Sequence, residues 1–255
     1  MKINLNADMA EGFGPYDIGD DAALMDIVKS ANIACGLHGG DATIMRRTVE
    51  IAKAKGVSIG AHPGFNDLWG FGRRALKMKA DDLENLVAYQ IGALQAMAAY
   101  AGVPVTHVKA HGALNNMACV DLDYARAVAR AVKVVSPDLI HLVMPGTALE
   151  TASAELGLTI GREAFIDRTY EEDGTLTPRA MAGSVLKDAD EAAARAVKMV
   201  ETKQIPARSG ELLNIEFDSL CVHGDEPTAV AVAKACRAAF DAAGIEVVTL
   251  PEMVG

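Results

Sequence analysis

The sequence lacks any long apolar run. None of its hydrophobic stretches approaches the ~18 residues of a membrane-spanning helix, so no contact with a membrane is expected. Its first residues, Lys2 to Asp8, alternate polar and apolar side chains, unlike the apolar core of a signal peptide. The four cysteines are scattered and form no CxxC pair, which predicts neither a disulfide framework nor a zinc knuckle. We therefore expect a cytoplasmic protein with free thiols.

Positively charged residues are also few in the sequence. The 24 lysines and arginines are outnumbered by 34 aspartates and glutamates, and arginines are adjacent only at Arg46-Arg47 and Arg73-Arg74. Proteins that bind nucleic acid normally carry a basic face, so no nucleic-acid partner is expected. The chain contains no GxxxxGK(S/T) motif, which excludes an ATP site built on a P-loop. No GxGxxG follows the first predicted strand, which disfavours a dinucleotide-binding fold.

Seven short apolar segments alternate with segments of helical periodicity along the 255 residues. This alternation predicts a parallel sheet, either closed as a (β/α) barrel or open and doubly wound. An α/β chain of this length commonly forms one unit, so we predict a single domain over residues 1–255. The predicted strands are residues 2–8, 31–35, 57–61, 105–108, 139–144, 158–164 and 220–222, with a short terminal strand at 246–250. The predicted helices are residues 20–29, 42–55, 81–101, 121–135, 147–156 and 188–201, and a last helix that ends at 243.

Titratable side chains follow most of the predicted strands. They are Asp8, Glu11, His38, Asp41, His62, Arg73, Arg74, Lys109, His111, Glu163, Asp167, Arg168, His223 and Asp225. Because they occur all round the chain, they favour a barrel, whose active site collects residues from the carboxyl ends of many strands. Single residues have ordinary structural explanations, and Asp41, Asp81 and Asp121 are expected to be helix caps. As a converging set of both charges, the strand-end residues indicate a catalytic pocket.

Three kinds of chemistry fit these residue types. In the first, Asp8, His38 and His62 hold a divalent metal, and Glu11 or His111 acts as the base. In the second, histidine and lysine side chains perform acid–base catalysis on an amide without a metal. In the third, arginines and glycine-rich backbone amides bind a phosphorylated or carboxylate substrate. The residues alone therefore predict a barrel-like hydrolase that acts on a small anionic substrate.

Six blocks of the sequence resemble the LamB/YcsF, or lactam-utilisation, family. The blocks are NLNADMAEGFG at 4–14, SANIACGLHGGD at 30–41, GAHPGFNDLWGFGRR at 60–74, VKAHGALNN at 108–116, REAFIDRTYEEDGTLTPR at 162–179 and CVHGDEP at 221–227. They lie in order from end to end, so the resemblance covers essentially the whole chain. It implies a fold similar to the seven-stranded (β/α) barrels of the glycoside hydrolase/deacetylase group.

The resemblance also implies an activity, that of the A subunit of bacterial ATP-dependent 5-oxoprolinase. With subunits B and C as partners, this enzyme uses ATP and water to convert 5-oxo-L-proline to L-glutamate, ADP and phosphate. Because the chain has no P-loop, we expect phosphorylation on the partner subunits and ring opening here. Asp8, Glu11, His38, His62, Lys109 and His111 are then the expected catalytic residues, with Asp8, His62 or His111 activating water. Arg73, Glu163, Asp167, Arg168, His223 and Asp225 are expected to bind the substrate, Lys109 and Arg73 to hold its phosphate or carboxylate, and a divalent metal is left open.

The chain departs from the family pattern at three positions. The family usually has Asp at position 4, Pro at 110 and Tyr at 115, where this chain has Asn4, Ala110 and Asn115. Asn4 is expected to point into the barrel, while Ala110 and Asn115 flank His111 and bear on the choice of lactam. Two other functions are alternatives: a stand-alone, metal-dependent amide or sugar deacetylase, and a lactam-binding subunit without catalytic activity.

Overall fold

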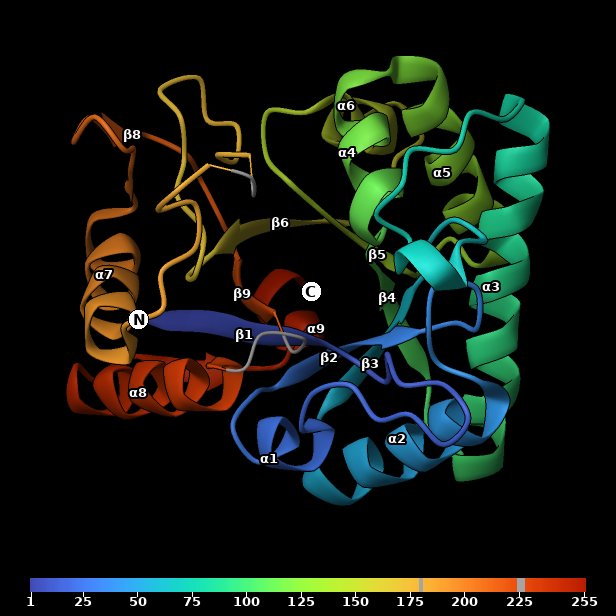
Figure 1. The fold of residues 1–255 in the computed structure, drawn as a ribbon, viewed down its shortest axis with the longest axis horizontal. Coiled ribbons are helices and arrows are strands. Elements are labelled where there is room, and N and C mark those ends of the chain that lie inside the picture. The colour runs from blue at the N-terminus through green and yellow to red at the C-terminus, as the bar shows by residue number, and fades with distance from the viewer. Residues whose placement is uncertain (179–180, 224–227) are drawn as a thin grey trace.

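The computed structural model describes residues 1–178, 181–223 and 228–255. Seven parallel strands form a closed barrel at its centre (Figure 1). In order of pairing they are β1 (Lys2–Met9), β2 (Ser30–Ala34), β3 (Ser58–His62), β4 (Val105–Val108), β5 (Ile140–Val143), β6 (Ile160–Phe165) and β9 (Ser219–His223). Strand β9 also pairs with β1, which closes the sheet. The predicted (β/α) barrel is therefore confirmed, and the open, doubly wound alternative is wrong.

Helices lie around this barrel, except that the last one, α9 (Leu250–Val254), lies within the ring of strands in the view of Figure 1 and contacts β1 and β6. The others are α1 (Asp21–Met25), α2 (Ala42–Lys55), α3 (Ala80–Ala101), α4 (Gly112–Val120), α5 (Leu122–Val135), α6 (Ala148–Glu155), α7 (Ala189–Thr202) and α8 (Ala229–Ala242), with a 3-10 turn η1 (Leu68–Gly70). Strand β10 (Glu246–Val248) pairs with the beginning of β1, and β7 (Ile205–Pro206) pairs with β8 (Leu212–Leu213). Among the described residues, no helix combines the length and the apolar character that crossing a membrane requires.

The helix boundaries follow local sequence signals closely. Asp41 accepts hydrogen bonds from the backbone amides two and three residues later, and Asp121 does the same at the start of α5. Gly56 ends α2 with φ +64°, a conformation that glycine adopts without strain. The expectation for Asp81 is wrong, because Lys79 occupies the cap position of α3 and Asp81 lies in the first turn.

Three segments differ from the sequence-based prediction. Residues 112–120 form helix α4 where a loop was expected, and its buried residues Ala113, Leu114 and Ala118 lie at helical spacing. Helix α1 ends at Met25, before the predicted end at 29, because the chain must turn there to enter β2. The terminal segment 246–250 is a strand only to 248, since Thr249 caps the short helix α9.

Polar side chains fill the interior of the barrel. Asn4, Asn6 and Asp8 alternate with apolar residues along β1 and are buried, so they share the face that points inward. From β2, the Asn32 amide donates to Oδ1 of Asn6 over 2.7 Å and to Oδ1 of Asp8 over 2.8 Å. Nε2 of His107 on β4 lies 3.0 Å from Oδ1 of the Asn32 side-chain amide. The expected inward position of Asn4 is confirmed, and a polar network leads up the barrel to its mouth.

Candidate active site

A cavity of about 1060 Å³ opens at the carboxyl ends of the barrel strands. The predicted site residues that line it are Asp8, Glu11, His62, Arg73, Lys109, His111, Arg168 and His223. Three more, His38, Glu163 and Asp167, are buried directly behind lining residues that they contact. Asp225 lies outside the described residues. The rest of the predicted set therefore converges on one pocket, while the role of each residue stays a prediction.

A buried lysine forms the floor of this pocket. The Lys109 ammonium, just beyond the end of β4, lies 2.9 Å from Asp8 and 2.9 Å from Glu163. Burial opposes its charge, but attraction to Asp8 and its other acidic neighbours outweighs burial and raises the pKa of Lys109 well above its usual range. Burial likewise opposes the charge of Asp8, yet His62 and Lys109 hold the pKa of this carboxyl well below its usual range. Both groups are therefore charged, and the positive charge of Lys109 is shared by two carboxylates.

Two imidazoles on one wall of the pocket face each other. Nε2 of His62, the last residue of β3, lies 3.0 Å from Nδ1 of His111, which precedes α4. The other ring nitrogen of His62 is 2.8 Å from the carbonyl oxygen of Lys109, and that of His111 is 2.8 Å from the carbonyl oxygen of Phe71. Because a carbonyl oxygen only accepts hydrogen bonds, these outer nitrogens carry the hydrogens. With hydrogens on the outer nitrogens alone, the two facing nitrogens would present lone pairs to each other. Burial opposes a second proton on His62, but attraction to Asp8 outweighs burial and raises the pKa of His62.

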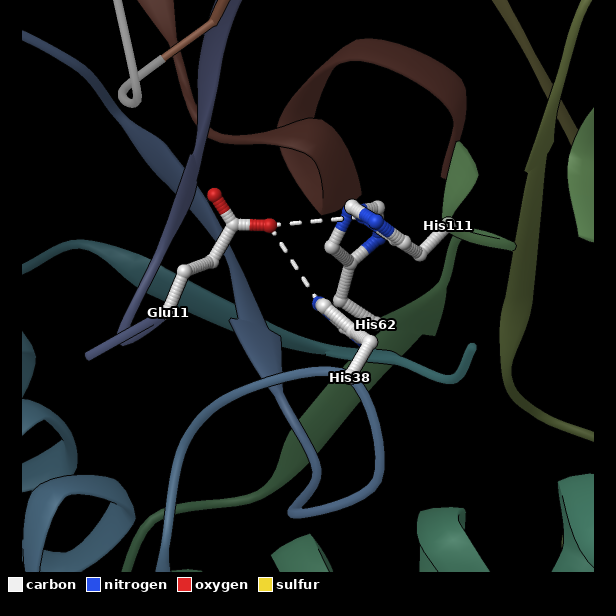
Figure 2. A group of neighbouring side chains, drawn as sticks. All are labelled: Glu11, His38, His62 and His111. Atoms are coloured by element: carbon white, nitrogen blue, oxygen red, sulfur yellow. Dashed lines mark hydrogen bonds and ion pairs between the residues drawn. The ribbon is translucent and has the colours of Figure 1, made fainter. Parts of the chain in front are cut away.

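Glu11 and His38 complete this group of side chains (Figure 2). Glu11 Oε1 lies 3.3 Å from Nδ1 of His111 and 3.3 Å from Nε2 of His38. Burial would raise the pKa of Glu11, but hydrogen bonding to His111 and His38 outweighs it and keeps the group ionised. Burial lowers the pKa of His38 to about 3, so its ring is neutral and donates to Glu11 through Nε2. Nδ1 of His38 has no hydrogen-bond partner among the described residues.

Glycine lets the loop after β3 approach these rings. His38 and His111 stack in parallel, with ring centroids 3.6 Å apart. At Gly72, which has φ +62°, a Cβ atom would lie 2.7 Å from His111 and 2.8 Å from His38. Any other residue here would collide with both rings and strain the backbone. Gly72 therefore allows close packing of this loop against the imidazoles.

His223 and Asp167 form a separate pair in the same pocket. His223 ends β9 and is the register partner of Asp8 on β1. Its Nδ1 lies 2.9 Å from Oδ2 of Asp167, and its ring stacks on Phe165 with centroids 5.2 Å apart. A carboxylate that holds Nδ1 fixes the ring so that Nε2 is available for proton transfer.

The two predicted arginines, Arg73 and Arg168, lie at different places in the pocket. Arg168 is buried and donates to the carbonyl oxygens of Thr177, over 2.6 Å, and Ser184, over 3.2 Å. These hydrogen bonds hold the loop that follows β6 in place beside the pocket. Arg73 lines the pocket with its guanidinium 5.1 Å from the centroid of the Phe71 ring.

Some residues of the site were not predicted from the sequence. Asn6 and Asn32 position Asp8 and Glu163 by hydrogen bonds, and Cys221 lies 3.1 Å from the Lys109 ammonium. A usable signal existed for Asn6, because polar residues at alternate positions of a buried strand must share a face. The sequence carries no comparable signal for Asn32 and Cys221, since their importance depends on which strands become neighbours.

Glu11, His38, His62 and His111 are also the described residues that could hold a metal ion. Each offers one ligand atom, and these atoms all lie within 4.8 Å of one another. This group differs from the ligand set expected from the sequence, because it includes Glu11 and His111, which were expected as bases. Asp8 instead contacts Lys109, although its Oδ2 lies only 3.4 Å from Nε2 of His62.

Comparison with known proteins shows the family to which the chain belongs. The model of the LamB/YcsF family matches residues 3–255. The chain belongs to the LamB/YcsF family. It is 52% identical over 248 residues, 97% of each chain, to the A subunit of 5-oxoprolinase from Nitrobacter hamburgensis. This confirms the family resemblance carried by the six sequence blocks.

Solved structures agree with the family and with the predicted fold. The crystal structure of the lactam utilization protein from Thermus thermophilus has a TM-score of 0.94 and 45% identity, covering 98% of this chain and 100% of that one. The catalytic domain of a peptidoglycan N-acetylglucosamine deacetylase from Eubacterium rectale has a TM-score of 0.50 at 10% identity, covering 97% and 87%. The second likeness concerns the fold alone, and it confirms the predicted similarity to deacetylase barrels.

Proposed function

We propose that this chain is the A subunit of an ATP-dependent 5-oxoprolinase, which opens the lactam ring of 5-oxo-L-proline to give L-glutamate. A relative that matches 97% of the chain is named as the A subunit of 5-oxoprolinase, and the similar Thermus protein is named for lactam utilization. The word subunit in the relative's name supports an assembly with partner chains, which we take to be subunits B and C.

The arrangement around Lys109 is the observation that carries this proposal. Asp8 contacts Lys109, with His62 on one side of it and His223, its register partner, on the other. Hydrolysis of an amide requires one group that takes a proton from water and another that gives a proton to the leaving nitrogen. Asp8 as the acceptor and His223 as the donor meet that requirement in one pocket.

The chemistry of the substrate explains the need for ATP. A five-membered lactam is a poor electrophile, and its ring closes again readily after opening. Transfer of the γ-phosphoryl group of ATP to the lactam oxygen makes the ring carbon electrophilic and couples the reaction to ATP hydrolysis. We assign this transfer to the partner subunits because the sequence has no P-loop. The cavity of about 1060 Å³ is large enough for the phosphorylated lactam.

Ring opening then takes place in this pocket. A water held by the Asp8 carboxylate attacks the phosphorylated ring carbon and gives up a proton to that carboxylate. The carbon–nitrogen bond breaks, and the nitrogen takes a proton from His223, which Asp167 holds in place. The product is an acyl phosphate, which a second water converts to glutamate and phosphate.

The anionic groups of the substrate need cationic side chains that line the pocket. Lys109 already neutralises two carboxylates, so we assign it to holding Asp8 and Glu163 in position, in place of the phosphate-binding role expected from the sequence. Arg73 takes the phosphate or carboxylate. Arg168 shapes the neighbouring loop and orients the substrate from there.

The test is release of glutamate from 5-oxoproline and ATP by the purified chain, alone and with its two partner subunits. We expect release only with the partners, and a fall of roughly 10²–10⁴-fold for His223→Asn, the size of an acid–base contribution. Tyr89→Ala, at an exposed position on α3, is the control that should keep full turnover.

Absence of release from a correctly assembled complex would refute the proposal, and acetate release without ATP would then support a deacetylase. Full turnover by His223→Asn would remove the role of that residue, and lactam binding with full turnover in all the histidine variants would support a non-catalytic subunit.

A further inference from the structure

Four acceptor atoms crowd one point in the pocket wall. They are Oδ2 of Asp8, Nε2 of His62, Nδ1 of His111 and Oε1 of Glu11, separated in that order by 3.4, 3.0 and 3.3 Å. Both imidazoles direct the hydrogens of their outer nitrogens to backbone carbonyls, and the two carboxylate oxygens adjoin the facing nitrogens. Lone pairs this close in a buried site repel unless a cation lies among them.

A single proton cannot satisfy all four atoms. A proton on Nε2 of His62 can be donated to Asp8 or His111, but it leaves Glu11 facing a lone pair of His111. A proton on Nδ1 of His111 can be donated to His62 or Glu11, but it leaves Asp8 facing a lone pair of His62. Protons on both facing nitrogens would point at each other across 3.0 Å. The arrangement therefore needs a cation that several lone pairs can share.

We propose that Glu11, His62 and His111 bind one divalent transition-metal ion. Ligand atoms about 2.0–2.1 Å from an ion at tetrahedral angles lie roughly 3.3 Å from one another. The observed separations of 3.0 Å between the imidazoles and 3.3 Å between Glu11 and His111 match that spacing. Two imidazoles and one carboxylate suit ions such as Zn²⁺ and Fe²⁺ better than the oxygen-binding Mg²⁺ or Ca²⁺.

The surroundings of the three ligands support this assignment. Each ligating imidazole donates its other N–H to a backbone carbonyl, the arrangement that fixes the tautomer of metal-bound histidines. His38 donates to the Glu11 carboxylate from behind, so it is a positioning residue and not a fourth ligand. Asp8 and the cavity border the remaining side of the site, which leaves a position for water or substrate. The site stands whether or not the chain opens a lactam, because it rests on lone-pair geometry alone.

Metal binding by the full chain, without partners, tests the proposal directly. The protein is stripped with a chelator and titrated with Zn²⁺ by calorimetry, and bound Co²⁺ is followed by its visible absorption. We expect one ion per chain in the wild type. His62→Gln and His111→Gln should weaken Zn²⁺ binding by more than the roughly 10- to 100-fold that loss of a supporting hydrogen bond costs.

Two further variants separate the ligands from their neighbours. His38→Ala should weaken binding by about 10- to 100-fold and keep the Co²⁺ spectrum, because it removes support and no ligand. His223→Asn, a change of the pocket histidine paired with Asp167, should keep full metal affinity. Circular dichroism of each variant confirms that it is folded. A wild type that takes up neither Zn²⁺ nor Co²⁺ stoichiometrically would overturn the proposal, as would undiminished binding in a double His62→Gln, His111→Gln variant.

Discussion

The barrel interior contains two polar regions, a lower one around Asn4 and an upper one at the mouth. They differ in how well their hydrogen-bond donors and acceptors are matched. In the lower region, Asn4 donates to Ser30 and to the carbonyl oxygen of Val248, and it accepts from Ser219, all within 2.8 Å. Asn6 joins the same network through Ser219 at 2.7 Å. Each of these contacts pairs a donor with an acceptor between neutral groups. The lower region is therefore complete without a ligand.

The upper region, at the mouth, contains charged groups and unmatched lone pairs. His62 and His111 face each other through acceptor nitrogens, and ionised Asp8 and Glu11 adjoin them. Lys109 offsets part of this negative charge from below. Burial is similar in both regions, so it does not distinguish structure from function here. What distinguishes them is whether donors and acceptors balance, and the unbalanced region is the one that a ligand, proton or metal must complete.

Gly72→Ala should disrupt the arrangement of side chains in the upper region and leave the lower region intact. Of the three substitutions, it should reduce turnover most. The new Cβ would displace His111 and His38, and misplacement by about 1 Å costs on the order of 100-fold in rate. The measurement is glutamate release by the assembled enzyme. Gly56→Ala is the matched control, because its φ is +64° but its Cβ would meet no atom of the described residues within 4 Å. Equal losses of turnover in both variants would mean that backbone strain is responsible and not contact with the imidazoles.

Asn4→Val should damage the lower region and leave the chemistry intact. The change removes three hydrogen bonds, and each buried polar group left unpaired costs about 1–3 kcal/mol of the free energy of unfolding. Urea denaturation measures that loss, and turnover per folded molecule should equal that of the wild type. Ile3→Val, an apolar change on the same strand, should cost only about 0.5–1.5 kcal/mol. Unchanged stability in Asn4→Val would contradict a structural role for the network.

Asp21→Asn tests whether burial raises the pKa of Asp21 while the pKa of Asp8 is lowered. Of the three substitutions, it should have the smallest effect on the protein. Burial raises the pKa of Asp21 to about 6, whereas cationic neighbours lower that of Asp8. An acid with a raised pKa stabilises the fold fully below its ordinary pKa of 3.8, and that stability is lost as pH rises through 6. Asparagine still accepts from the Ala10 amide but carries no charge. The variant should therefore melt a few degrees higher than the wild type at pH 8 and match it near pH 4, and the reverse order would refute the shift.

Much of the architecture could be predicted from local sequence patterns. Helix α2 was predicted correctly at both ends, because Asp41 and Gly56 are strong signals within the segment itself. Helix α4 was missed, because it begins directly after His111, whose side chain makes no cap hydrogen bond. The choice between a barrel and an open sheet depended on where titratable residues fall, and the pairing of β9 with β1 decided it.

By itself, the sequence determined the family, the alternation of strands with helices and which residues gather at the mouth, since parallel strands in a closed ring bring their carboxyl ends together. Only the tertiary structure decided what those residues do to one another. The sequence paired neither Lys109 with Asp8 and Glu163 nor His223 with Asp167. The direction of each imidazole lone pair depends on carbonyl oxygens tens of residues away, those of Lys109 for His62 and Phe71 for His111. Hydrogen-bond direction is a property of positions in space, and spacing along the chain does not encode it.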